Sequence, residues 1–103
     1  MTAIIGWAHS KFGKLDGETL ESLIASVARE AIADAGVAPA DIEAIYVGNF
    51  GGFEKQSFPA AFALNAAPEL RFRPATRVEN ACATGSAAVH MADQSIKARN
   101  ARF

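Results

Sequence analysis

The 103-residue chain has an ordinary globular composition, because half of its residues are hydrophobic and a fifth are charged. Its formal net charge is -1 and its positive charges are scattered, so we expect no nucleic-acid partner. The sequence contains no signal peptide and no apolar run long enough to span a membrane, which excludes a membrane partner. A single cysteine excludes an internal disulfide and a cysteine-rich zinc site, so we expect a cytoplasmic protein without a metal.

Two elements are predicted in the first third of the chain. The apolar run at residues 3–8 indicates a strand, and residues 20–35 have the spacing of an amphipathic helix. The apolar face of this helix consists of Leu20, Leu23, Ile24, Val27, Ala28, Ala31, Ile32 and Ala35. Thr19 is suited to cap its first turn and Gly36 to end it.

Five further elements follow. Residues 44–48 predict a strand buried on both faces, and Ser57 could cap a short helix that runs to about Asn65. Residues 75–79 predict a third strand, residues 83–98 a long helix, and residues 101–103 the first step of a fourth strand.

The order of these elements, βαβαβα, predicts an α/β fold in one domain, residues 1–103. Such a domain has a mostly parallel sheet with helices on both faces, in three layers. The pattern stops before the layers are filled, so we expect an incomplete, truncated domain.

The helix predicted at residues 83–98 has small residues on almost every side of its first half. No charged residue lies between Glu79 and Asp93. A helix without a polar face is normally buried all round, so we expect further chain or a partner to cover it.

Cys82 lies where the third strand leads into this helix. Unpaired N–H groups and the helix dipole concentrate positive potential at such a position, which stabilises a thiolate and makes a nucleophile available. Gly85 leaves room for a substrate, and Thr84 and Ser86 add small hydroxyl groups. The other interpretation is an inert, buried cysteine that acts as a small hydrophobe, and the residues alone leave both open.

The block from Arg77 to Ala88, Arg-Val-Glu-Asn-Ala-Cys-Ala-Thr-Gly-Ser-Ala-Ala, resembles the nucleophile block of the thiolase family. It is most similar to the sterol-carrier-type and acetyl-CoA acetyltransferase-like branch. Residues 18–23, 35–37 and 45–50 resemble earlier segments of that branch, in the same order.

The resemblance implies that an acyl-CoA acylates Cys82 and that the acyl group then forms, or comes from, a 3-ketoacyl-CoA. It implies a thiolase-like N-terminal half-fold within a longer, homodimeric enzyme of lipid metabolism. No prosthetic group is implied, because the coenzyme A thioester is itself the substrate.

The further groups of thiolase chemistry have no counterpart in the sequence. It lacks a second cysteine, and His9 and His90 do not lie in matching blocks. His90 would lie roughly 12 Å along the helix axis from Cys82, too far for a hydrogen bond. We therefore expect the chain to be inactive alone.

Two alternatives stay open. The chain could be a non-catalytic interaction module that keeps a thiolase half-fold and binds a partner through its sheet edge and small-residue helix. It could also belong to a related condensing enzyme, a ketoacyl synthase or a hydroxymethylglutaryl-CoA synthase.

Two other patterns are interpreted as structural. The glycine-containing segment 48–57 lacks the glycine-lysine-serine/threonine sequence of a phosphate loop. Five aromatic residues could line a ligand groove, but core packing is the more frequent explanation. They are Trp7, Phe50, Phe53, Phe58 and Phe62.

Overall fold

The structure, a computed structural model, describes residues 1–51 and 58–103. Its main elements are α1 (Leu20–Ala35), β1 (Ile45–Gly48), β2 (Ala75–Val78) and α2 (Thr84–Lys97). Four 3₁₀ helices lie between them: η1 (Pro39–Asp41), η2 (Pro59–Ala66), η3 (Pro68–Leu70) and η4 (Ala81–Ala83). The predicted α/β class is confirmed.

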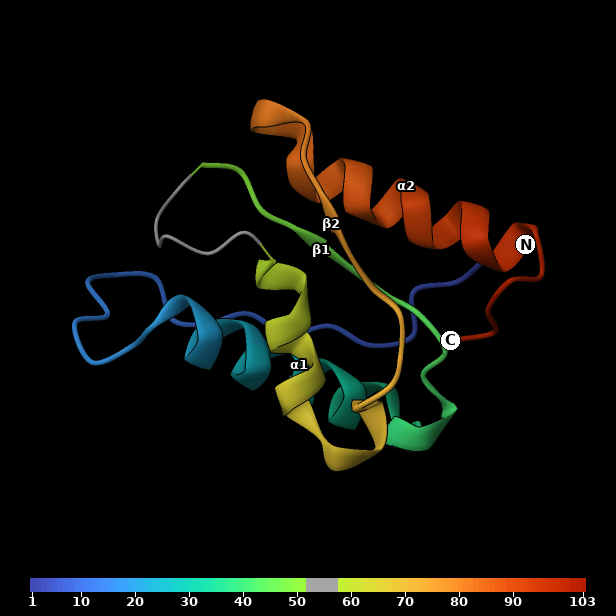
Figure 1. The fold of residues 1–103 in the computed structure, drawn as a ribbon, viewed down its shortest axis with the longest axis horizontal. Helices are drawn as coiled ribbons and strands as arrows, with labels where there is room; N and C mark the ends of the chain where they lie inside the picture. Colours follow the sequence, from blue (N-terminus) through green and yellow to red (C-terminus); the bar gives the residue numbers. More distant parts are fainter. Residues whose placement is uncertain (52–57) are drawn as a thin grey trace.

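The two strands run parallel, with Ile45 opposite Ala75 and Gly48 opposite Val78. Helix α2 packs on these strands, whereas α1 packs mainly on η2 (Figure 1). A groove of about 410 Å³ separates α1 from β1, lined on the α1 side by Leu23, Ile24, Val27 and Ala28. The helices therefore lie on different sides of the strand pair, but α1 does not close tightly against it.

Both predicted ends of α1 are confirmed. The Thr19 hydroxyl accepts a hydrogen bond from the Ser22 N–H (3.1 Å), and the Ser22 hydroxyl accepts one from the Thr19 N–H (2.9 Å). Gly36 ends the helix in the left-handed region, at φ 68°, where its N–H donates to the Ala33 carbonyl. Local capping chemistry thus fixes the helix at the residues that the sequence indicated.

The strands predicted at residues 3–8 and 101–103 are wrong, as is the βαβαβα order that includes them. A strand needs a neighbouring strand for its backbone groups, and residues 3–8 instead cross the end of α1, where the Trp7 N–H donates to the Asp34 carboxylate (2.9 Å). At the C-terminus, the Phe103 carbonyl accepts one bond from the Glu43 N–H (2.8 Å), which is not a ladder.

Strand β1 is less buried than predicted. Ile45, Tyr46 and Val47 are half-buried and Gly48 is exposed, because β2 covers only one edge of the strand and the groove beside α1 stays open. The short helix predicted from Ser57 is a 3₁₀ helix that begins at Pro59. The proposed Ser57 cap lies outside the described residues.

The core is built from small residues around η2. Leu70 and Pro59 are the large side chains that are fully buried. Ala60, Ala63 and Ala66 of η2 are also buried, and the Arg29 guanidinium donates to the Ala66 carbonyl (3.2 Å). Alanine-rich packing lets α1 and η2 approach closely, but each contact removes little apolar surface from water.

Helix α2 is not buried all round. Thr84 and Ser95 are buried on the side that faces the strands, whereas Val89, His90 and Met91 are exposed. The strand pair covers one side of the helix and residues 2–4 lie beside its second half, which leaves Val89, His90 and Met91 exposed in the described structure. None of the helices in the described part of the chain combines the length and apolar character needed to cross a membrane.

Replacing Leu70 by alanine tests the core. The side chain is fully buried, so Leu70→Ala should lower the free energy of unfolding by about 2–5 kcal/mol, measured by urea denaturation. Phe72→Ala is the matched control, because Phe72 is exposed and its loss should change stability by less than about 0.5 kcal/mol. Equal effects of the two substitutions would contradict this core.

Gly6→Ala tests the path of the N-terminal segment. A Cβ at Gly6 would stand 2.6 Å from the backbone nitrogen of Ala35, so the segment must move. We expect a loss of about 1–3 kcal/mol and a changed emission of Trp7, measured by fluorescence during denaturation. Gly17→Ala should leave both unchanged, since a Cβ there meets nothing within 4 Å.

Candidate active site

Cys82 lies in η4, the short turn that joins β2 to α2. Strand β2 ends at Val78, and α2 begins at Thr84. Cys82 is exposed, and the turn that contains it directly precedes the amino end of α2. The structure thus places Cys82 at the strand-to-helix turn and, among the alternatives for this residue, contradicts the buried cysteine.

Side-chain oxygens on either side of Cys82 hold the turn. The Glu79 carboxylate accepts a hydrogen bond from the Ala81 N–H (2.6 Å). The Thr84 hydroxyl accepts one from the Asn80 N–H (2.8 Å) and donates to the Ala81 carbonyl (2.7 Å). These bonds are local, so the conformation of the turn is set by residues 79–84 themselves.

The turn contains a strained residue directly before the cysteine. Ala81 has φ 43°, in the left-handed region that side chains with a Cβ disfavour. Such conformations persist only where surrounding contacts impose them, and they are frequent at functional sites. Here the contacts are the hydrogen bonds that Ala81 makes to Glu79 and Thr84.

Strand β1 supports the turn from the side. A Cβ placed on Gly48 would lie 3.0 Å from the Thr84 methyl carbon and 3.0 Å from the Thr84 carbonyl oxygen. The end of β1 therefore touches the first residue of α2, and glycine is what permits this approach.

The amino end of α2 can stabilise negative charge. Its N-cap is Ala83, and no side chain caps the first turn. The Ala83 N–H and the Thr84 N–H already donate to the carbonyls of Asn80 and Ala81, so the potential comes from the positive end of the helix dipole. An oxygen that gains negative charge beside Cys82 would meet this potential, as in an oxyanion hole.

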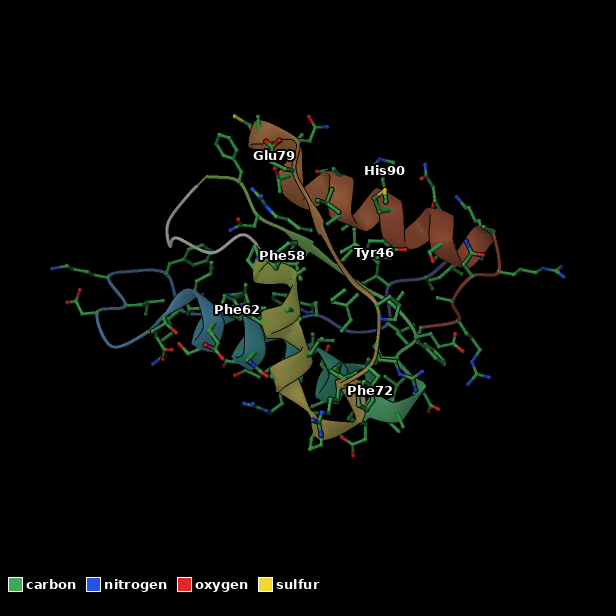
Figure 2. The ribbon with its side chains drawn as sticks, in the orientation of Figure 1. Tyr46, Phe58, Phe62, Phe72, Glu79 and His90 are labelled. Carbon is green, nitrogen blue, oxygen red and sulfur yellow. The ribbon has the colours of Figure 1, made fainter. Side chains whose placement is uncertain are left out.

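Neither histidine joins the turn. His90 lies along α2, away from Glu79 and η4 (Figure 2). His9 interacts within its own segment, where its ring stacks on Trp7 with 5.3 Å between centroids. The described contacts therefore bring no histidine to Cys82, as the sequence predicted.

A carboxyl group with a lowered pKa, that of Asp93, lies in the second half of α2. The Lys97 ammonium hydrogen-bonds the Asp93 carboxylate (2.7 Å) and holds the pKa of that carboxyl below its ordinary value. Eleven residues separate Asp93 from Cys82, roughly 16 Å along a helix, so this pair supports the last turn and not the thiol.

The aromatic residues do not form a core. Trp7, Phe50 and Phe58 are 68%, 55% and 80% exposed, and Phe62 is half-buried. Figure 2 labels Phe58 and Phe62, which both come from the segment around η2. The prediction of core packing is thus wrong for Trp7, Phe50 and Phe58, because the faces that would cover them are open. Phe53 and most of the glycine-containing segment lie outside the described residues.

Sequence reasoning located Cys82 but missed three residues that fix its turn: Gly48, Glu79 and the hydroxyl of Thr84. A hydroxyl residue that follows an expected turn can bond the backbone of that turn, and this signal could have indicated the role of Thr84. The roles of Glu79 and Gly48 depend on the backbone conformation and on the strand register, for which the sequence has no local signal.

Comparison with known proteins agrees with the resemblance. Residues 2–103 match the family model described as "Thiolase, N-terminal domain". The acetyl-CoA acetyltransferase of Methanothermobacter thermautotrophicus is 42% identical over 89 residues, which are 84% of this chain and 23% of that protein. The acetyl-CoA acetyltransferase of Methanocaldococcus jannaschii is 41% identical over 92 residues, 87% of this chain and again 23% of the relative. The chain thus matches less than a quarter of the length of these relatives.

Gly48→Ala tests the support from β1. The added methyl would overlap Thr84 and displace the first turn of α2, so we expect a loss of about 1–3 kcal/mol in the free energy of unfolding. Cys82 should also react with iodoacetamide at a changed rate. Gly85→Ala is the control, because a Cβ there meets no atom within 4 Å and should be neutral or stabilising. An unchanged Gly48→Ala protein would contradict the contact.

Proposed function

The chain belongs to the thiolase family, and we propose that it is the nucleophile-bearing N-terminal segment of a thiolase-like, CoA-dependent acyltransferase. The observation that carries this proposal is the exposed Cys82 in a strained, hydrogen-bonded turn at the uncapped amino end of α2. That arrangement offers a nucleophile and a positive potential at one place.

In the proposed reaction, the Cys82 sulfur attacks the carbonyl carbon of an acyl-CoA thioester. The Cys82 thiol gives up its proton to solvent, a new carbon–sulfur bond forms, the bond to coenzyme A breaks, and coenzyme A leaves as a thiolate that takes up a proton from solvent. The amino end of α2 would stabilise the oxyanion that forms on the way. The acyl group would then pass to a second acyl-CoA, giving a 3-ketoacyl-CoA, or the reverse.

We propose that this 103-residue segment does not catalyse the complete reaction by itself. Carbon–carbon bond formation needs a base for the thiol and an acid-base group for the substrate α-carbon. The sequence has no second cysteine, and neither His9 nor His90 lies at the turn. In the complete cytoplasmic enzyme, the missing groups, the full three-layer fold and a homodimer contact would come from further chain.

An interaction module remains a second candidate, because large apolar side chains are exposed on several segments. Ile4, Trp7, Phe12 and Met91 are among them. A groove of about 530 Å³ between the first six residues, α1 and α2 adds apolar surface. The related condensing enzymes are less well supported, since the match is to the thiolase N-terminal domain.

The proposal is tested by incubating the chain with acetyl-CoA and measuring intact mass over time. We expect one acetyl group on Cys82, transferred more than about tenfold faster than to N-acetylcysteinamide. The reason is that the turn exposes the thiol and the helix end would stabilise the oxyanion that forms during the transfer. Cys82→Ser is the control and should acquire no thioester.

Transfer no faster than to the free thiol compound would contradict the nucleophile assignment. The same result together with concentration-dependent oligomers, measured by sedimentation, would favour the interaction module. An adduct that persists in Cys82→Ser would identify lysine acetylation instead.

A further inference from the structure

We propose that Thr84 is the positioning residue of the Cys82 turn, and that its hydroxyl, not its methyl group, sets the reactivity of the thiol. This inference rests on the proposed function of Cys82 as the nucleophile. Thr84 itself would touch no substrate and would act through the backbone that presents the cysteine.

One side-chain oxygen atom adds two hydrogen bonds to the two backbone bonds that close the turn, from the Ala83 N–H to the Asn80 carbonyl and from the Thr84 N–H to the Ala81 carbonyl. Thr84 is only 7% exposed, and its hydroxyl accepts from the Asn80 N–H while donating to the Ala81 carbonyl. It therefore joins the backbone groups of two successive residues just before Cys82. Ser86, one half-turn further along α2, is exposed and lies outside this arrangement.

The residue that Thr84 holds is the strained one. The Ala81 N–H donates to the Glu79 carboxylate and the Ala81 carbonyl accepts from Thr84, so side chains bind both polar groups of this residue. Without the Thr84 bond, Ala81 at φ 43° would relax toward negative φ, which a residue with a Cβ prefers. That relaxation would rotate the peptide that leads into Cys82.

Strand β1 keeps the hydroxyl in place. The Thr84 methyl carbon faces the end of β1, where a Cβ on Gly48 would stand 3.0 Å from it. The methyl group thus packs on the strand while the hydroxyl points into the turn. The two roles can be separated, because valine keeps the packing and serine keeps the hydrogen bonds.

The experiment compares Thr84→Val with Thr84→Ser in the 103-residue chain, with Thr76→Val as the control. Thr76 is an exposed residue of β2, so its replacement should leave the turn unchanged. Two quantities are measured: amide hydrogen exchange at Asn80 by NMR, and the rate of Cys82 alkylation by iodoacetamide at one fixed pH.

In Thr84→Val, the Asn80 amide should exchange about fivefold faster or more, since it loses its acceptor. The alkylation rate should move toward that of the chain in denaturant. Thr84→Ser should restore both readouts to within about twofold of the wild type, and amides of α1 should exchange at the wild-type rate in all variants.

Four results would overturn the inference. The first is a Thr84→Val alkylation rate equal to that of the wild type, and the second is a Thr84→Ser variant as impaired as Thr84→Val. The third is equally faster exchange throughout α1, and the fourth is a wild-type alkylation rate equal to that of the denatured chain. The second result would assign the effect to the methyl group, and the third to global stability. Failure of acetyl transfer in the wild type would instead contradict the proposed function, and the exchange and alkylation measurements would still decide the role of Thr84.

Discussion

Parallel hydrogen bonding between β1 and β2 sets the position of every element around Cys82. Parallel strands end at the same edge of a sheet, and the register places Gly48 opposite Val78. The chain that leaves β2 must therefore turn beside the end of β1. A glycine at that end lets Thr84 approach within contact distance, and the helix that follows packs back on the strands. The strand register and the absence of a side chain at Gly48 thus determine where the turn lies.

The sequence predicted the elements whose signals are local. The cap at Thr19, the stop at Gly36 and the apolar spacing between them define α1 within a single segment, and the structure agrees. Residues 3–8 have the composition of a strand but no neighbour to pair with, so the prediction failed there. The position of Cys82 was predictable because strand and helix meet at it. The contributions of Glu79 and Gly48 were not, because they depend on the φ angle of Ala81 and on the strand register.

The predictions that α2, Trp7 and Phe58 are buried were wrong for a different reason. Too few described residues are available to cover them. The accessible surface is 7264 Å², whereas a compact monomer of this mass exposes roughly 5,500 Å². The excess is about twice the area that one partner contributes to a standard protein interface. Exposed apolar side chains include some whose burial the sequence predicted, among them Val89 of α2, Trp7 and Phe58. The hydrophobic pattern therefore describes a more enclosed environment than these residues create by themselves.

Because of this shortage of covering surface, a well-held Cys82 turn and a well-covered helix α2 are separate properties in this chain. The hydrogen bonds of the Cys82 turn involve only residues 79–84, and its lateral support comes from Gly48. None of these contacts depends on the uncovered faces of α2 or on the exposed aromatic residues. The Cys82 thiol can therefore be held in place although α2 and the aromatic residues are exposed. Changes in residues 79–84 or at Gly48 should alter the position of the thiol, whereas a partner that covers α2 should leave these contacts unchanged.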